Sequence, residues 1–181
     1  MIHKGNLEIT NSNAKNYKDL VEVTGDLSIH SEAKLEAPKL ESVGGDLYIN
    51  SEAKLEALKS VGGCLSIYSK AKLEAPKLES VGDYLYINSE AKLEALKSVG
   101  GNLNIYSEAK LEALKSVGGC LSIYSKAKLE APKLESVGDD LSIHSEAKLE
   151  APKLESVGGY LYIHSEAIKN FPNNLIHWKK F

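Results

Sequence analysis

The pattern Leu-X-Ile recurs nine times along this chain, at intervals of 18 or 20 residues. A repeating unit of this length cannot bury its own apolar side, and it becomes stable only when it stacks on its neighbours. The repeat therefore predicts an all-β fold, a parallel β-solenoid of about nine coils of 18–20 residues. The copies begin at Leu7, Leu27, Leu47, Leu65, Leu85, Leu103, Leu121, Leu141 and Leu161.

Each coil divides into three segments. In the coil that begins at Leu27, residues 26–30 and 32–37 alternate apolar and polar side chains, as strands with one buried side do. Residues 38–45 place Leu40 and Val43 three apart, which predicts a helical or 3₁₀ turn. When the shared run Glu-Ala-Lys-Leu-Glu-Ala is aligned, the 18-residue coils lack two residues in this third segment. The small alanines of the second strand predict a narrow core, which Ala53→Leu should overpack.

The array is expected to form one domain over residues 1–181, because a stack of coils has no internal boundary that few contacts cross. Residues 1–25 are predicted to be an N-terminal cap coil, 26–166 the regular coils and 167–181 a C-terminal cap. The last segment contains the only tryptophan, Trp178, and both phenylalanines, Phe171 and Phe181. Large apolar side chains suit a cap that closes the core. The alternative is a tail that docks on a partner or a membrane.

The charge balance restricts the possible functions. All 22 basic residues are lysine, against 25 acidic residues, and the net charge is −3. This argues against a nucleic-acid partner, and the lack of arginine removes the forked donor used to bind phosphate and guanine. No P-loop, dinucleotide-binding, nucleophile-elbow, HExxH or CxxC motif occurs. The acidic residues repeat evenly instead of forming one cluster, so we expect neither enzyme activity nor a cofactor.

The chain contains no apolar h-region and no run of about 18 apolar residues, so no membrane association is expected. Cys64 and Cys120 occupy the same repeat position three coils apart, roughly 14 Å at the usual strand spacing and too far for a disulfide. Two unpaired thiols fit a reducing compartment. A cytoplasmic location is predicted, with association to a virion or a cell surface as the alternative.

The run from Leu40 through Val43-Gly44-Gly45-Asp46 to Leu47-Tyr48-Ile49 resembles the repeat of receptor L domains and of fungal cell-wall proteins with L-domain-like repeats. It is also similar to bacterial and phage leucine-rich-repeat proteins built on K-L-E-A-P-K-L-x-S-V-G-G. Serine stands where leucine-rich repeats proper carry an asparagine ladder, so the match is to the looser L-domain type. The resemblance covers roughly residues 5–168. It implies a right-handed solenoid of stacked parallel strands that serves as a binding surface without catalysis.

Eight of the nine tyrosines lie at outward positions of the first strand, among serine, asparagine and histidine and nearly without charge. Such surfaces are typical of binding sites, because tyrosine offers rigid amphipathic area at low entropic cost. The alternative is that tyrosine is a good strand former which stacks in stabilising ladders. His144 and His164 should stack as well, but two ligands on an open face make a weak metal site, and no metal is expected. The candidate binding residues are Tyr48, Tyr68, Tyr84, Tyr86, Tyr106, Tyr124, Tyr160, Tyr162, His144 and His164.

These features together predict a non-enzymatic binding or scaffold module whose partner is a protein or a glycan. The chain itself is expected to be a monomer or a weak homo-oligomer. A second class of function is structural, a solenoid of a surface or of a phage particle. A phage-encoded inhibitor of a host protein is a special case of binding.

Overall fold

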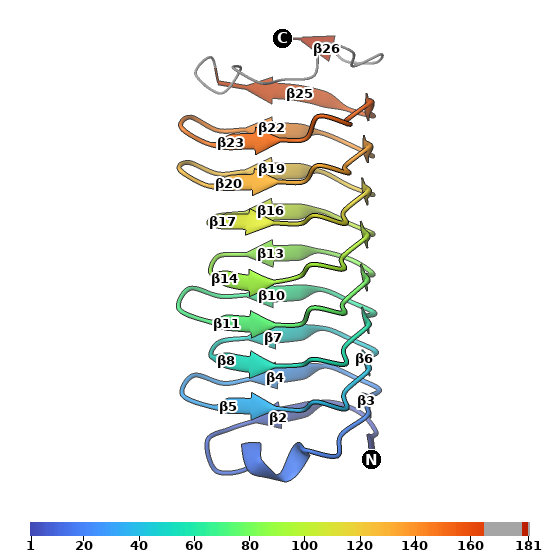
Figure 1. The fold of residues 1–181 in the computed structure, drawn as a ribbon, viewed down its shortest axis with the longest axis vertical. Helices are drawn as coiled ribbons and strands as arrows, with labels where there is room; N and C mark the ends of the chain where they lie inside the picture. The colour runs from blue at the N-terminus through green and yellow to red at the C-terminus, as the bar shows by residue number, and fades with distance from the viewer. Residues whose placement is uncertain (165–178, 181) are drawn as a thin grey trace.

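The computed structural model describes residues 1–164 together with Lys179 and Lys180. The chain winds into a parallel β-solenoid in which most coils add one short strand to each of three sides (Figure 1). Residues 7–160 make about eight turns, and β25 (Tyr160–Ile163) begins a ninth. The predicted all-β solenoid of about nine coils is therefore confirmed. The helical element of the described residues is one 3₁₀ turn, η1 (Ala14–Tyr17).

The first side is a ten-stranded sheet made by the nine Leu-X-Ile segments and by β26. Its strands stack in register, so that Leu65 lies opposite Leu47 on one side and Leu85 on the other. The observed strand, Leu27–Ile29 in the coil used above, lies inside the predicted span 26–30. With β25, the strands are β2 (Leu7–Ile9), β4 (Leu27–Ile29), β7 (Leu47–Ile49), β10 (Leu65–Ile67), β13 (Leu85–Ile87), β16 (Leu103–Ile105), β19 (Leu121–Ile123), β22 (Leu141–Ile143) and β26 (Lys179–Lys180).

The third side is a nine-stranded sheet, whereas a helical turn had been expected there. The turn is limited to residues 37–40, where the Leu40 N–H donates to the Ala37 carbonyl, and a two-residue strand follows. Short strands form because Val43 and its equivalents point inward and stack coil on coil. The strands are β1 (Ile2–His3), β3 (Glu22–Val23), β6 (Ser42–Val43), β9 (Ser60–Val61), β12 (Ser80–Val81), β15 (Ser98–Val99), β18 (Ser116–Val117), β21 (Ser136–Val137) and β24 (Ser156–Val157).

The second side is divided into two sheets, one of four strands and one of three. Its strands are shorter than the predicted span 32–37 because a wide turn occupies the start of that span. The four-stranded sheet contains β5 (Lys34–Glu36), β8 (Glu52–Lys54), β11 (Lys72–Glu74) and β14 (Glu90–Lys92). The three-stranded sheet contains β17 (Glu108–Lys110), β20 (Lys128–Glu130) and β23 (Lys148–Glu150).

The two-residue difference between coils lies in the turn before the second strand, so the predicted gap in the third segment is wrong. Leu35 of a 20-residue coil, here called a long coil, pairs with Ala53 of an 18-residue or short coil, and Lys34 pairs with Glu52. An alignment of identical residues would place Ala53 opposite Ala33, whereas in the structure Ala53 lies opposite Leu35. The second strand of a short coil is therefore shifted by two positions relative to that alignment. A shift of two preserves which side chains point inward, because strand side chains alternate with period two. The long coils in the regular stack are 27–46, 65–84, 121–140 and 141–160, and the short coils are 47–64, 85–102 and 103–120.

This shift packs large side chains against small ones. Ala53 lies between Leu35 and Leu73 in one buried column, and Leu55 follows it in the next column. Each coil therefore contributes one leucine and one alanine to these two columns, in opposite order in long and short coils. Such complementary packing keeps the core dense without overfilling it.

The wide turn of each long coil contains one residue with positive φ. The φ values are 69° at Glu32, 70° at Lys70, 68° at Lys126 and 65° at Glu146. A side-chain-bearing residue in this left-handed region costs about 1–2 kcal/mol. The long coils therefore carry local strain that the short coils avoid with a tighter turn.

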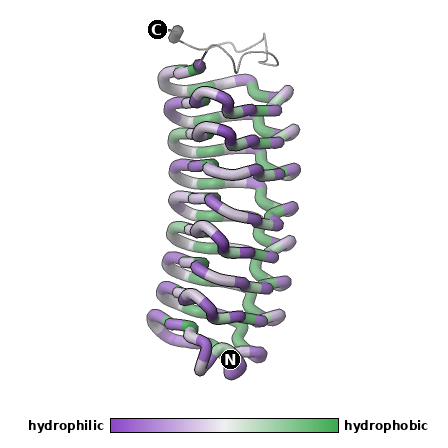
Figure 2. Tube along the Cα trace, turned by 90° about the vertical axis from the view of Figure 1, so that its left-hand side faces the viewer, coloured by the Kyte–Doolittle hydropathy of each residue, from purple (hydrophilic) through white to green (hydrophobic). Residues whose placement is uncertain are grey.

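The core is a narrow column of aliphatic side chains that runs the length of the stack. Figure 2 shows the hydrophobic positions of successive coils lying above one another. Leu47, Ile49 and Leu58 are completely buried, and no polar or charged side chain of the described residues is buried. At about 1.5–3 kcal/mol for each buried leucine or isoleucine, this column is the main source of stability.

In the first coil the 3₁₀ turn η1 stands where the regular coils have a second strand. Ala14 of this turn is buried, and Tyr17 packs against the core. That residues 1–25 act as a cap stays a prediction. The predicted C-terminal cap, with Phe171, Trp178 and Phe181, lies outside the described residues apart from β26. In the described part of the chain, no helix has the length and apolar character needed to cross a membrane.

Candidate functional site

The outward surface of the first sheet from Asp46 to His164, which we call the aromatic face, carries all ten predicted binding residues. Its side chains form three columns, contributed by the residue before each Leu-X-Ile segment, the central residue and the residue after it. The strand register stacks equivalent residues, as with Tyr48 and Ser66. Tyr84 and Tyr160 belong to the first column, Tyr48, Tyr86 and Tyr162 to the second, and Tyr68, Tyr106, Tyr124, His144 and His164 to the third.

Six of these side chains form a continuous ladder of rings along the solenoid. The closest pair is Tyr106 and Tyr124, with ring centroids 4.0 Å apart and planes 9° from parallel. His144 stacks on Tyr124 at 4.8 Å and 14°. The ladder runs through Tyr68, Tyr86, Tyr106, Tyr124, His144 and His164, with successive centroid distances of 6.1, 4.7, 4.0, 4.8 and 6.2 Å.

The ladder is continuous because Tyr86 compensates for an interruption in its column. The third-column residue of coil 85–102 is Asn88, and Tyr86 of the second column comes within 4.7 Å of Tyr106 instead. Stacked aromatic pairs contribute about 0.5–1.5 kcal/mol each beyond their buried area. The ladder therefore stabilises the first sheet, as the alternative interpretation of the tyrosines predicted.

Stacking also determines which part of each ring a partner could reach. Where the rings are stacked, as at Tyr106, Tyr124 and His144, the ring faces cover one another, and edges and hydroxyl groups remain accessible. Tyr68 is 39% exposed and Tyr106 is 36% exposed. Burial, together with the hydroxyl of Tyr124, raises the pKa of Tyr106 well above the usual value for a phenol. The Tyr106 hydroxyl thus stays neutral and able to donate a hydrogen bond over the physiological pH range.

Three tyrosines are more exposed than the ladder. Tyr84 is 47% exposed, Tyr160 is 41% exposed and Tyr162 is 49% exposed. The rings of Tyr160 and Tyr162 lie 6.1 Å apart at 52°. These side chains extend the amphipathic area of the face beyond the stacked rings.

Asp46 and Tyr48 form a hydrogen-bonded pair on the same face. The Tyr48 hydroxyl donates to Asp46 Oδ2 at 2.6 Å. This bond is the largest cause that raises the pKa of Tyr48 to about 12 and lowers the pKa of Asp46. Tyr48 is consequently held against the sheet and is less free than the other tyrosines to contact a partner.

A ladder of Asp and Asn side chains in the first column was missed by the sequence analysis. Asp46 Oδ1 accepts the N–H of Cys64 at 2.7 Å, and Asn102 Oδ1 accepts the N–H of Cys120 at 2.8 Å. The same bond joins Asp140 to Tyr160 at 2.6 Å. These side chains satisfy backbone donors between coils, so Asp46 has a structural role and is not a free recognition residue.

The sequence does contain a signal for this ladder. A Cβ added to Gly63 would collide with Asp46 Oδ1, and one added to Gly119 would collide with Asn102 Oδ1. Cys64 and Cys120 occupy the position of Asp46 in their own coils. In the coil that follows each of them, the position of Gly63 is held by an aspartate, Asp83 or Asp139. The pairing of Asp or Asn with glycine one coil later marks the ladder.

The outward strand residues of the second side are lysines and glutamates, which lie in columns along the stack. Because the strand shifts by two residues, each column alternates in sign between long and short coils. Lys34 contacts Glu52 at 3.2 Å, and Lys92 contacts Glu74 at 3.5 Å. These exposed ion pairs contribute about 0–1 kcal/mol each and keep the side solvated.

The remaining candidate groups lie apart from one another. Cys64 and Cys120 are free and half-buried, and burial raises the pKa of the Cys64 thiol. His144 and His164 have ring centroids 6.2 Å apart. Within residues 1–164 and 179–180, no group of three or more His, Cys, Asp or Glu side chains is arranged to hold a metal ion.

No protein-family model matches this chain, and neither a curated protein nor a solved structure matches it.

Proposed function

We propose that this protein is a non-enzymatic binding module whose partner docks on the aromatic face. The observation that supports the proposal is a row of accessible tyrosine edges and hydroxyls on a rigid sheet, with few charged groups. Rigid tyrosine side chains lose little conformational entropy when they bind, and they can both pack and donate hydrogen bonds. The L-domain-like resemblance of the repeat, on Leu40, Val43, Leu47 and Ile49, is part of this proposal.

A protein partner fits this face better than a glycan does. Sugar rings are commonly bound by stacking on an open aromatic face, and here the ladder faces are covered by neighbouring rings, as at Tyr106 and Tyr124. Edge contacts and hydroxyl hydrogen bonds suit the mixed polar and apolar surface of a protein. The exposed rings of Tyr84 and Tyr162 are where a glycan would bind instead.

The test compares capture of proteins from a lysate of the source by wild type and by two face variants. In one variant, serine replaces Tyr68, Tyr86, Tyr106 and Tyr124; in the other, phenylalanine replaces them and preserves stacking. A matched control, Glu36→Gln with Lys54→Gln, alters the second side only. Circular dichroism verifies that each variant is folded.

We expect at least a tenfold loss of the captured partner with the serine variant, an intermediate loss with the phenylalanine variant and none with the control. Since hot-spot tyrosines typically contribute about 2 kcal/mol or more, such a loss is measurable. Capture that is equal for wild type and the serine variant would refute the proposal.

The second candidate is a structural role on a surface or a phage particle. Inhibition of a host protein by a phage-encoded protein is instead a special case of the binding function. The uniform stack of coils favours the structural role, because a solenoid can extend by end-to-end association. Sedimentation over a range of concentrations separates the two, since a structural polymer grows with concentration and a binding module does not.

A further inference from the structure

The second side is interrupted between β14 and β17. Both neighbouring junctions are paired, β11 with β14 and β17 with β20, whereas β14 and β17 belong to different sheets. In paired junctions a backbone bond follows the strand, as from the Leu55 N–H to the Glu74 carbonyl or from the Leu111 N–H to the Glu130 carbonyl, each 2.8 Å. The equivalent bond from Leu93 to Lys110 is missing among the bonds of the described residues.

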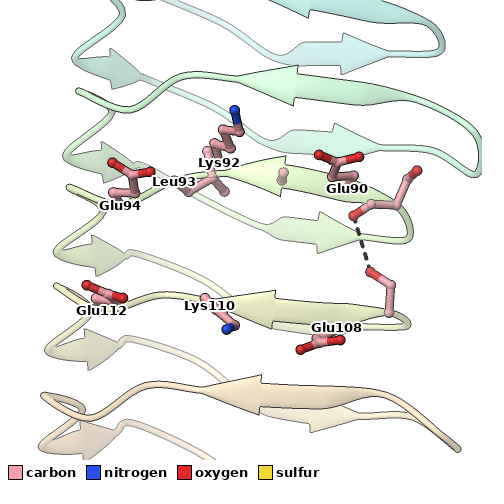
Figure 3. A pocket seen from close by; sticks show the side chains of 10 residues that line it. Glu90, Lys92, Leu93, Glu94, Glu108, Lys110 and Glu112 are labelled. Carbon is pink, nitrogen blue, oxygen red and sulfur yellow. Dashed lines mark hydrogen bonds between the residues drawn. The ribbon is translucent and has the colours of Figure 1, made fainter.

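A groove of about 530 Å³ opens at this interruption, which we call the seam (Figure 3). Ala91 and Leu93 form its floor, and glutamates of both coils line its sides. The Ser107 hydroxyl donates to the Ser89 carbonyl across the seam at 3.2 Å. At the turn before the strands, a side-chain bond thus joins coils whose strands do not pair.

The seam lies where two short coils are consecutive, 85–102 and 103–120. Pairing there would set Glu90 opposite Glu108 and Lys92 opposite Lys110, and like charges directly opposite destabilise a sheet. The lysines extend away from the seam instead: Lys92 contacts Glu74 of the preceding coil, and Lys110 contacts Glu130 of the following coil at 3.7 Å.

The junction of two long coils shows why charge is not the whole cause. Lys128 lies opposite Lys148 there, yet β20 and β23 pair. Leu129 stacks on Leu149, and Lys128 bridges to Glu150 at 3.1 Å. At the seam, pairing of the strands would bring only Ala91 opposite Ala109, because Leu93 and Leu111 follow the strands at the next inward position. The strand residues themselves therefore offer little apolar contact to offset the repulsion.

The other two sides are continuous across the same junction. β13 pairs with β16 on the first side, and β15 pairs with β18 on the third. The ring contact of Tyr86 with Tyr106 crosses it as well. At this junction the strands of the first and third sides are therefore paired, and only those of the second side are not.

We propose that the seam is a flexure joint built into the solenoid. The segments 1–102 and 103–164 tilt about the paired first and third sheets, which opens and closes the second side. Solenoid coils couple chiefly to their nearest neighbours, so the junction with fewest bonds moves first. The joint does not depend on the aromatic face being a binding site.

Amide hydrogen exchange of wild type and of two coil-replacement variants tests the missing bonds. Relative to Leu55, the Leu93 amide of wild type is expected to exchange about tenfold faster or more, the effect of one lost hydrogen bond. The first variant replaces residues 103–120 with a copy of 121–140, which sets a long coil against coil 85–102. Its Leu93 amide should slow to the Leu55 rate.

The second variant acts in the opposite direction. It replaces residues 65–84 with a copy of 103–120, so that coil 47–64 meets a short coil, and its Leu55 amide should become fast. Equal protection of Leu93 and Leu55 in wild type, or unchanged rates in both variants, would overturn the proposal.

Distances between spin labels test the motion itself, in a background with Cys64→Ser and Cys120→Ser. Labels at Glu36→Cys and Glu150→Cys lie on the second side, on opposite sides of the seam. Labels at Glu41→Cys and Glu155→Cys occupy the same two coils on the third side and serve as the control pair. Replacing coil 103–120 should narrow the distance distribution of the second-side pair only. No change in that pair would exclude a joint.

Discussion

Overpacking of the second-side core gives the sharpest test of the observed register. Ala53 is completely buried between Leu35 and Leu73, and parallel strands hold it on both sides. Ala53→Leu adds three carbon atoms to this column, for which there is no space. Overpacking a dense core typically costs about 1–3 kcal/mol, and we expect the upper half of that range because backbone hydrogen bonds resist spreading of the coils.

The matched control uses the same chemical change four residues later. Ala57 is half-exposed in the turn that follows β8, so Ala57→Leu should change the free energy of unfolding by less than about 0.5 kcal/mol. An alignment of identical residues would instead equate Ala57 with the buried Ala37 and predict equal damage. The two substitutions therefore separate the observed register from the one read off the repeat.

A compensating pair of changes extends the test. Leu55→Ala alone should cost about 2–5 kcal/mol, the transfer of three buried carbons plus a cavity. Ala53→Leu combined with Leu55→Ala restores the total volume and mimics the long-coil order, so its cost should fall below the sum of the single changes by about 1 kcal/mol or more. Urea unfolding followed by circular dichroism measures all four variants. Additive costs, or a harmless Ala53→Leu, would refute the packing argument.

Three further predictions concern local features. Lys126→Gly should stabilise the protein by about 0.5–1 kcal/mol in the same unfolding assay, because φ is 68° there and glycine removes the strain. Tyr48→Phe should remove a phenol whose pKa is raised to about 12. The hydrogen bond of Tyr48 to Asp46 stabilises the fold below the unfolded value near 10, and this contribution is lost as pH rises through 12, which tyrosinate absorbance reports. The pKa of Asp46 is lowered, so its contribution to the free energy of unfolding is present above about pH 4 and is lost as pH falls through the folded value. Asp46→Asn retains the Oδ1 acceptor and should make stability less dependent on pH at acidic pH, which unfolding measured from pH 2 to 6 checks.

The columns of the first side could be predicted because the alternation of inward and outward side chains is set within each short strand. Leu47 and Ile49 alternate with outward residues over three positions, and nothing outside the strand is needed to choose the buried side. The gathering of the tyrosines on one surface follows from that alternation alone. Their division into stacked rings such as Tyr106 and Tyr124 and more exposed rings such as Tyr84 does not, since it depends on the side chain in the neighbouring coil.

The repeat by itself determined the solenoid, the number of coils and the sides that face the core. Only the tertiary structure decided where the two-residue difference lies, because a strand shifted by two residues keeps the same side chains inward and looks equally good in isolation. The choice is made by contacts between coils, which place Leu35 against Ala53 and Lys34 against Glu52. Where two short coils meet, alanine would lie opposite alanine and each charge opposite a like charge, so the contacts that pair the other strands are missing. The strands β14 and β17 therefore stay unpaired, and the seam lies between them.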